Sequence, residues 1–208
     1  MHRLCSSCIS SIEKSNENSI EFSLSNTNKG AVGLILALEL ASLTPFKSPM
    51  AALVFFIKKK DGSLWLVQDY QALNSMTVKN KYPLPLISEL VSQLRRARYF
   101  TKLDVCWGFN NIRIKPGDEW KAAFRTNRGL FEPLVMFFGM TNSPATFQTI
   151  MNDIFRNLIA EGIVVVYLDN ILIFTKMEEE HAQAVRWMLQ VLKKNKLFFR
   201  LEKCEFYK

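Results

Sequence analysis

The chain has 208 residues, 49% of them hydrophobic, and a formal net charge of +8 at pH 7. This length allows one large or two small hydrophobic cores, and the mean hydropathy of +0.02 is typical of a soluble globular protein. The four cysteines exclude a disulfide-rich scaffold in a chain this long, and the basic charge favours an anionic partner, most often nucleic acid.

The N-terminal part of the sequence differs in composition from the rest. Residues 1–30 are rich in Ser, Asn, Lys and Glu, which predicts a mobile leader, and residues 31–43 favour a short helix. That apolar run is too short to span a bilayer and contains Glu39. Cys5 and Cys8 have half of a zinc-site spacing without a second pair of ligands, so we expect no zinc. We expect no signal peptide and no membrane segment, and an intracellular protein of the cytoplasm or nucleus.

Residues 52–67 have the pattern of a β-hairpin. The apolar run 52–57 leads into Lys58-Lys59-Lys60-Asp61-Gly62, and a second apolar run follows at 64–67. Asp-Gly between two such runs is a strong turn signal. On the residues alone, the lysines favour a solvated strand edge, and the alternative is a fingertip that contacts phosphate.

The remainder of the chain alternates between strand and helix patterns. A strand over 99–105 carries Asp104 near its end. The other expected elements are a helix over 88–94 capped by Ser88, strands over 121–125 and 130–136, helices over 144–159 and 178–195, and a final strand over 197–201. This order predicts an α+β fold in which helices pack on an antiparallel sheet.

Residues 164–174 contain two short β-branched apolar runs separated by Asp169-Asn170, which predicts a buried hairpin with a polar turn. A carboxylate at the tip of an apolar hairpin is costly unless its charge is used. Asp104 is placed in the same way, at the end of a strand. If the two strands are neighbours, the paired carboxylates can hold Mg²⁺ for phosphoryl or nucleotidyl transfer. The alternative is an ordinary polar turn.

A series of short motifs also follows the order of a known family. The motifs are Ser48-Pro49, Lys58-Lys59-Lys60-Asp61-Gly62-Ser63-Leu64, Asp69-Tyr70, Ala72-Leu73-Asn74, Lys81-Tyr82-Pro83-Leu84-Pro85, Phe100-Thr101-Lys102-Leu103-Asp104, Ala123-Phe124-Arg125-Thr126, Phe138-Gly139-Met140-Thr141-Asn142-Ser143-Pro144-Ala145-Thr146-Phe147 and Tyr167-Leu168-Asp169. Together they resemble the reverse transcriptase of Ty3/gypsy-type LTR retrotransposons. The variants Trp107-Gly108-Phe109-Asn110-Asn111 and Met136-Phe137-Phe138-Gly139 resemble the fungal branch of these elements.

The resemblance extends from residue 43 to the end of the sequence and implies a right-hand polymerase fold with a ferredoxin-like palm. Residues 45–98 and 116–145 would form the fingers, with the palm between and after them. Residues 1–42 would be an unrelated leader, and 43–208 would hold fingers and palm without thumb, connection or RNase H regions. The implied activity is RNA-directed DNA polymerisation on an RNA or DNA template-primer, with dNTPs as substrates and two Mg²⁺ ions, or Mn²⁺, as cofactor.

The family also implies a catalytic metal site. Asp104 and Asp169 match the metal-binding aspartates, and the backbone carbonyl of Val105 matches a further ligand. Asn170 stands at a catalytic position where the family has a second adjacent Asp. It keeps an acceptor oxygen but removes one negative charge.

The substrate-binding residues are implied in the same way. Lys59 matches the fingertip lysine that contacts the incoming triphosphate, which reverses the preference for a solvated edge. Phe109 matches the aromatic residue that packs under the deoxyribose and excludes a 2′-hydroxyl. Phe138 and Gly139 match residues that line the nucleotide pocket. The sequence assigns no individual nucleic-acid-binding residue and no oligomeric state.

Three further positions depart from the family pattern: Trp65, Gln71 and Cys106 each stand where Arg is usual. Trp65 replaces a guanidinium that grips the triphosphate, and an indole cannot donate to phosphate in that bidentate way. These changes and Asn170 can each arise from a single G-to-A or C-to-T mutation. We therefore hypothesise a truncated, partly decayed copy, and the alternative function is a catalytically impaired remnant that only binds nucleic acid.

Overall fold

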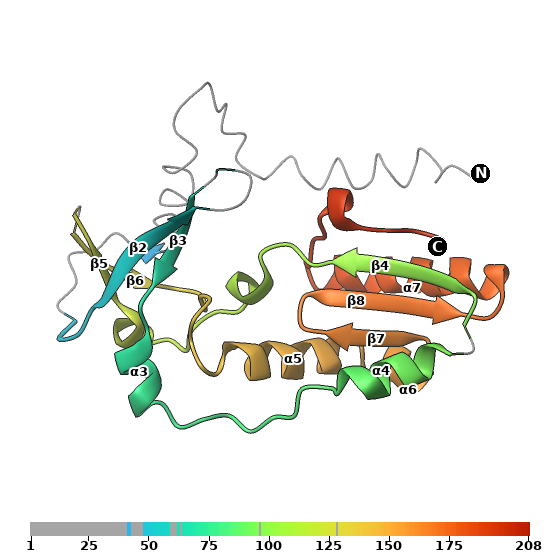
Figure 1. Ribbon diagram of the computed structural model, residues 1–208, viewed down its shortest axis with the longest axis horizontal. Coiled ribbons are helices and arrows are strands. Elements are labelled where there is room, and N and C mark those ends of the chain that lie inside the picture. Colours follow the sequence, from blue (N-terminus) through green and yellow to red (C-terminus); the bar gives the residue numbers. More distant parts are fainter. Residues whose placement is uncertain (1–40, 43–47, 59–61, 63, 96, 128) are drawn as a thin grey trace.

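The structure, a computed structural model, describes residues 41–42, 48–58, 62, 64–95, 97–127 and 129–208. Its strands form one five-stranded and one three-stranded sheet, which lie at opposite ends of an elongated molecule (Figure 1). The expected α+β fold with helices on an antiparallel sheet is confirmed. Within the described residues, no helix has both the length and the apolar character needed to cross a membrane.

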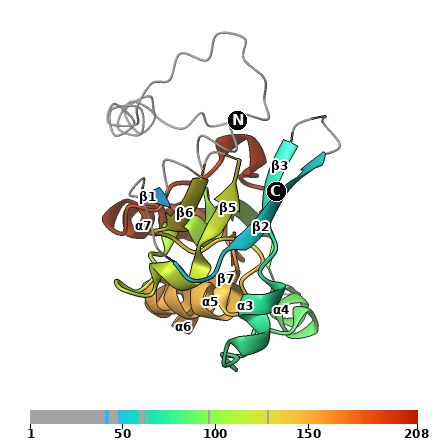
Figure 2. The same cartoon turned by 90° about the vertical axis from the view of Figure 1, so that its left-hand side faces the viewer.

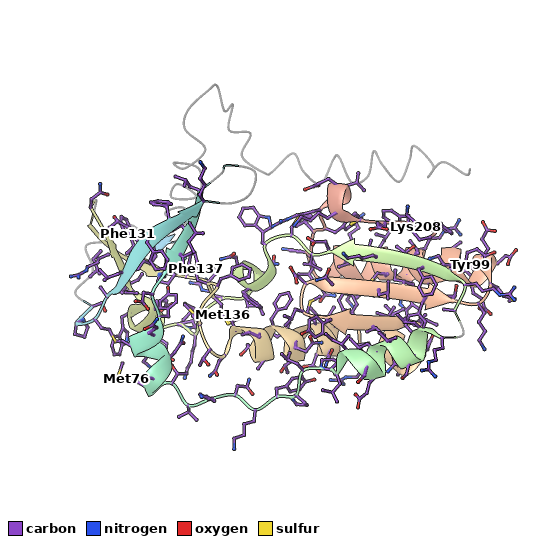
Figure 3. All side chains as sticks on the ribbon, viewed as in Figure 1. Met76, Tyr99, Phe131, Met136, Phe137 and Lys208 are labelled. Carbon is purple, nitrogen blue, oxygen red and sulfur yellow. The ribbon has the colours of Figure 1, made fainter. Side chains whose placement is uncertain are left out.

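The five-stranded sheet has the order β1-β6-β5-β2-β3. Its strands are β1 (Ala41–Ser42), β2 (Ala52–Lys58), β3 (Leu64–Gln68), β5 (Phe124–Thr126) and β6 (Gly129–Pro133). The expected hairpin is present, because β2 pairs antiparallel with β3, and β2 also pairs parallel with β5. Phe131 and Phe137 mark the small core of this end of the molecule (Figure 3). The turned view shows how far the tips of β2 and β3 project (Figure 2).

A long connection leads from the first sheet to the second. It contains α3 (Gln71–Met76) and α4 (Ile87–Leu94), joined by the extended stretch around Pro83 and Pro85. The helix α4 begins after Leu86 and has no side-chain cap, so Ser88 lies inside its first turn and is not the predicted cap.

The three-stranded sheet has the order β4-β8-β7 and carries the main core. Its elements are β4 (Tyr99–Asp104), β7 (Val164–Tyr167), β8 (Asn170–Thr175), α5 (Ser143–Ile154), α6 (Arg156–Ala160) and α7 (Glu178–Lys194). The helix α7 packs on β4 and β8, whereas α5 and α6 pack on β7. Burying each large apolar side chain in such a core stabilises the fold by about 1.5–3 kcal/mol.

Helix α7 begins with Glu178-Glu179-Glu180 and ends with Lys193-Lys194. Acidic residues at the start of a helix and basic residues at its end complement the helix dipole. The helix expected over 178–195 is thereby confirmed to within one residue.

Several sequence predictions need correction or fall outside the described residues. The helix expected over 144–159 is divided, since the helical pattern is interrupted at Phe155 between α5 and α6. The strand expected over 130–136 begins at Gly129 and ends at Pro133. Most of the leader lies outside the described residues, and so does most of the helix expected over 31–43. The two described residues of that expected helix, Ala41–Ser42, form a strand instead, because they pair with β6.

The strand expected over 197–201 is also not formed. Instead, the C-terminal segment returns to β4 through isolated bridges, Val105 to Phe199 and Lys102 to Glu205. Between these bridges lies the short 3₁₀ helix η3 (Leu201–Lys203). The backbone N–H of Arg200 donates to the Asp104 carbonyl at 2.9 Å. The C-terminal segment is therefore fixed beside the end of β4.

Candidate active site

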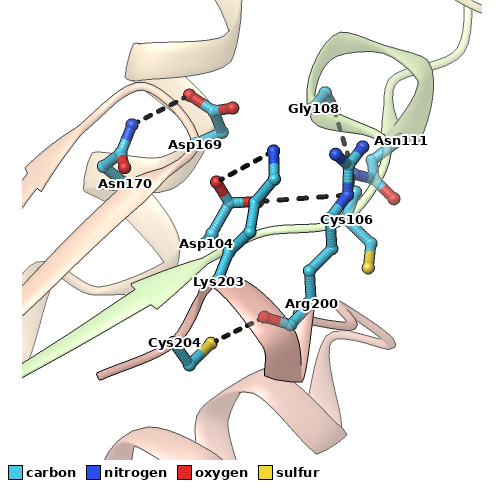
Figure 4. A network of polar contacts seen from close by, with 9 residues as sticks. All are labelled: Asp104, Cys106, Gly108, Asn111, Asp169, Asn170, Arg200, Lys203 and Cys204. Carbon is cyan, nitrogen blue, oxygen red and sulfur yellow. Dashed lines mark hydrogen bonds and ion pairs between the residues drawn. The ribbon is translucent and has the colours of Figure 1, made fainter. Parts of the chain in front are cut away.

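The end of β4 and the β7–β8 turn bring two carboxylates together. Asp104 is the last residue of β4 and is paired in register with Asn170, the first residue of β8. Asp169 precedes Asn170 in the turn, and its carbonyl accepts a 2.8 Å hydrogen bond from the N–H of Val105. Figure 4 shows the Asp104 side chain at the end of β4 and the Asp169 side chain on the adjacent turn. The expectation that their strands are neighbours is therefore correct.

The turn that carries Asp169 falls one residue earlier than its sequence predicts. Tyr167 pairs with Asn170, so the two turn residues are Leu168 and Asp169, not Asp169 and Asn170. Leu168 has a φ of 53°, in the left-handed region. This conformation costs a residue with a Cβ about 1–2 kcal/mol. Another part of the fold must therefore hold it.

The buried side chain of Gln148 on α5 holds this turn. Its Oε1 accepts the N–H of Leu168 at 2.8 Å, and its Nε2 donates to the Val166 carbonyl at 3.0 Å. Gln148 is completely buried, so each of these hydrogen bonds satisfies a group that has no access to water. A strained backbone conformation of this kind persists only where the surrounding structure holds it in place, and such positions are often found at functional sites.

The charges at the site are unevenly distributed. Asp104 is 9% exposed, and two cations of the C-terminal segment face it: Arg200 Nε lies 4.0 Å from Oδ1 and Lys203 Nζ lies 3.9 Å from Oδ2. Asp169 instead accepts a 3.3 Å hydrogen bond from the side-chain amide of Asn170. Both ion pairs are long and their cations are solvent-exposed, so each contributes little to stability.

Two of the residues expected to bind nucleotide, Phe109 and Phe138, lie against each other. The Phe109 ring is buried and lies 4.8 Å from the Phe138 ring, centroid to centroid, while Phe138 is 43% exposed. Gly139 has a φ of 93°, which favours glycine. The Asn74 side chain of α3 holds this loop, donating to the Gly139 carbonyl at 2.7 Å and accepting the Thr141 N–H at 2.8 Å.

The four departures from the family pattern do not share one environment. Asn170 and Cys106 lie at the carboxylate site, whereas Gln71 is exposed at the start of α3, where its N–H donates to Asp69. Burial raises the pKa of the Cys106 thiol despite the neighbouring Arg200 guanidinium, which lowers it. Trp65 is placed only by its backbone, which pairs with Ile57 in the β2–β3 hairpin. The predicted phosphate contact Lys59 lies outside the described residues.

The carboxylate site offers oxygen ligands of the kind that Mg²⁺ prefers. Asp104 and Asp169 supply carboxylates, and the backbone N–H of Val105 donates to the Asp169 carbonyl. Asn170 supplies an amide oxygen where a third carboxylate would add charge. Within the described parts of the chain no group of three or more His, Cys, Asp or Glu side chains gathers. Two carboxylates, an amide oxygen and a backbone carbonyl fit a hard divalent ion that takes further oxygen ligands from a substrate phosphate.

Sequence reasoning missed three residues at this site: Gln148, Arg200 and Lys203. Gln148 lies within an otherwise apolar helical stripe, and a polar residue at such a position is a usable signal for a buried contact. No comparable signal exists for Arg200 or Lys203. Their approach to Asp104 depends on the return of the C-terminal segment to β4.

The chain belongs to the reverse transcriptase (RNA-dependent DNA polymerase) family, whose model matches residues 57–208. Among its relatives are the Tf2-7 and Tf2-3 transposon polyproteins of Schizosaccharomyces pombe strain 972, which are 45% and 44% identical to it over 161 residues. These alignments cover 77% of this chain but 12% of each polyprotein. The resemblance to the reverse transcriptases of Ty3/gypsy-type retrotransposons is confirmed.

Solved structures support the same fold. The native protease-reverse transcriptase of prototype foamy virus superposes with a TM-score of 0.72 at 26% identity, over 86% of this chain and 24% of that chain. The foamy viral enzyme in complex with an RNA/DNA hybrid gives a TM-score of 0.71 at 23% identity, over 78% of this chain and 22% of that chain. The right-hand fold of fingers and palm is thereby confirmed.

Proposed function

We propose that residues 43–208 form the fingers and palm of an RNA-directed DNA polymerase that extends a primer 3′-OH with dNTPs on an RNA or DNA template. The observation that supports this most is the placement of Asp104 and Asp169 on adjacent strand ends. The net charge of +8 favours binding of the template-primer backbone. The foamy viral relatives solved with an RNA/DNA hybrid and with double-stranded DNA support the same partner.

In this proposal the metal site consists of Asp104, Asp169 and the Val105 carbonyl. Two bound Mg²⁺ ions, or Mn²⁺, would activate the primer oxygen and stabilise the leaving phosphate. The carboxylates of Asp104 and Asp169 would hold these ions. The turn, which is held by Gln148, keeps Asp169 beside Asp104. Asn170 orients Asp169 through its 3.3 Å hydrogen bond but adds no charge.

The other assigned residues would position the nucleotide. Phe109 would lie under the deoxyribose and leave no room for a 2′-hydroxyl, and its contact with Phe138 fixes the ring. Gly139 allows the backbone to approach the nucleotide closely. Lys59 would contact the triphosphate as a point charge.

A second candidate function is nucleic-acid binding without catalysis. It is favoured by Asn170, because loss of one carboxylate weakens the electrostatic stabilisation that dominates phosphoryl transfer. The absence of a guanidinium at Trp65 acts in the same direction. In this case the basic chain would still bind the phosphate backbone. The leader 1–42 and an intracellular location remain predictions.

Primer extension on a homopolymer template separates the two functions. Extension by the full chain that disappears in Asp104→Ala supports the polymerase. If the native chain is inactive but the double variant Asn170→Asp, Trp65→Arg extends the primer, the chain is a decayed polymerase. If neither protein extends a primer and both bind the template-primer with the same affinity, the function is nucleic-acid binding without catalysis. The polymerase proposal for this copy then fails.

A further inference from the structure

The C-terminal segment places a guanidinium at the catalytic carboxylates. The backbone N–H of Arg200 donates to the Asp104 carbonyl at 2.9 Å, which anchors this residue beside the end of β4. Its side chain then reaches toward the site, with Nε 4.0 Å from Asp104 Oδ1 (Figure 4). This distance exceeds that of a hydrogen bond, so the contact is electrostatic and can be exchanged for a better one.

The local charges explain why a cation lies there. Asp104 is largely buried and needs a counter-charge, and Asp169 lies next to it on the neighbouring strand end. Arg200 and Lys203 both form their ion pairs with Asp104. A divalent ion bound between the carboxylates would repel both side chains and leave them close to any anion that arrives with it.

We propose that Arg200 is a triphosphate-binding residue that serves as the counter-ion of Asp104 until a metal–nucleotide complex binds, an inference that rests on the proposed polymerase function. When the metal–nucleotide complex occupies the carboxylates, the Arg200 guanidinium leaves Asp104 and donates to phosphate oxygens. Arg200 would thereby weaken the binding of metal alone and strengthen the binding of metal with nucleotide.

The chemistry of the guanidinium selects Arg200 over its neighbour Lys203 for this role. A guanidinium donates two parallel N–H groups to phosphate, whereas an ammonium acts as a point charge. The Arg200 side chain is 42% exposed, so it can turn from the carboxylate to the phosphate without disturbing the core. It also lies beside Cys106, so the C-terminal segment brings a guanidinium to this part of the site (Figure 4).

The test measures Mn²⁺ binding to the full chain by electron paramagnetic resonance, with and without dTTP. Arg200→Gln is expected to bind Mn²⁺ alone about threefold more tightly, because one cation near the carboxylates is gone. In the presence of dTTP the same variant is expected to bind about tenfold more weakly, because a charge-assisted hydrogen bond to phosphate is lost. Arg200→Lys should show both changes to a smaller extent.

The control is Arg186→Gln, which removes the same charge from the exposed side of α7 and is expected to change neither affinity. Circular dichroism melting checks that each variant is folded. If Arg200→Gln does not fold, Arg200→Lys carries the comparison. Two affinities that stay unchanged, or that move in the same direction, overturn the role of Arg200 while leaving the polymerase intact. If the native chain binds neither Mn²⁺ nor Mn²⁺ with dTTP, the polymerase proposal fails, and the role of Arg200 fails with it.

Discussion

The Oε1 atom of Gln148 accepts a 2.8 Å hydrogen bond from the backbone N–H of Leu168. Gln148 belongs to α5, and Leu168 is the first residue of the turn that carries Asp169. A helix outside the sheet thus determines the conformation of a turn between two of its strands. The position of Asp169, which we propose to be catalytic, therefore depends on a side chain from another element.

Replacing Gln148 by Met keeps the volume of the side chain but removes its hydrogen bonds to Leu168 and Val166. Because these backbone groups are then left without partners in the core, the free energy of unfolding is expected to fall by about 1–3 kcal/mol. Urea denaturation measures it. The matched control is Gln190→Met on the exposed side of α7, for which a change within about 0.5 kcal/mol is expected. Equal losses in both variants would contradict a role for Gln148 in holding the turn.

Asn74→Ala removes the side chain that links α3 to Gly139 and Thr141. We expect a loss of about 1–2 kcal/mol in the free energy of unfolding, because two hydrogen bonds disappear, both of which join segments far apart in the chain. We also expect weaker binding of dTTP, since the loop after Phe138 is no longer fixed. Denaturation and nucleotide titration measure the two effects. The exposed Asn157→Ala variant serves as the control, and nucleotide binding as strong in Asn74→Ala as in the native chain would refute the second expectation.

His181 is fully buried, and both ring nitrogens contact threonine hydroxyls: Nε2 lies 2.8 Å from Thr101 Oγ1 and Nδ1 lies 3.1 Å from Thr175 Oγ1. Burial lowers the pKa of His181 below its ordinary value of 6.5. The unfolded chain therefore takes up the proton first as the pH falls.

It follows that the stability contributed by neutral His181 is fully present above about pH 6.5 and is lost as the pH falls toward the lower folded pKa. Urea denaturation at about pH 8 and about pH 5.5 is expected to show a less stable protein at the acidic pH. In His181→Gln this difference should shrink, because no imidazole is left to titrate there. A pH dependence equal to that of the native chain would rule out His181 as its source.

Phe109→Val tests the proposed exclusion of the 2′-hydroxyl. The smaller side chain opens space beside Phe138, so incorporation of ribonucleotides relative to deoxynucleotides is expected to rise by at least about tenfold. Primer extension with each nucleotide measures this ratio, in the Asn170→Asp, Trp65→Arg background if the native chain is inactive. Loss of contacts with Phe138 and Phe147 also costs about 1–3 kcal/mol of stability. An unchanged ratio in a folded variant would remove Phe109 from this role.

Much of the three-stranded sheet and its helices could be predicted, because their sequence patterns are strong and local. The charges at the ends of α7 and the β-branched runs on either side of Asp169 agree with the elements observed. The sequence predicted that Asp104 and Asp169 can meet if their strands are neighbours, and β4 does pair with β8. Their catalytic role stays a prediction.

The remaining features depend on contacts between distant segments. The turn at Leu168 needs a left-handed backbone conformation that leucine disfavours, and the side chain of Gln148 holds it. The segment 197–201 has a strand-like composition, yet only isolated bridges connect it to β4, so periodicity could not place Arg200 at the site. In both cases the local pattern was overruled by tertiary structure.

The β7–β8 hairpin has a consequence for changes in chain length. Val164, Val165 and Val166 are all buried, so the strand has no polar face that would resist a shift of one residue. The turn and Gln148 therefore hold the alignment of β7 with β8. An inserted or deleted residue between Tyr167 and Asn170 would leave the strands equally apolar while moving Asp169 away from Asp104. This hairpin should tolerate many conservative substitutions within its strands but no change in the length of its loop.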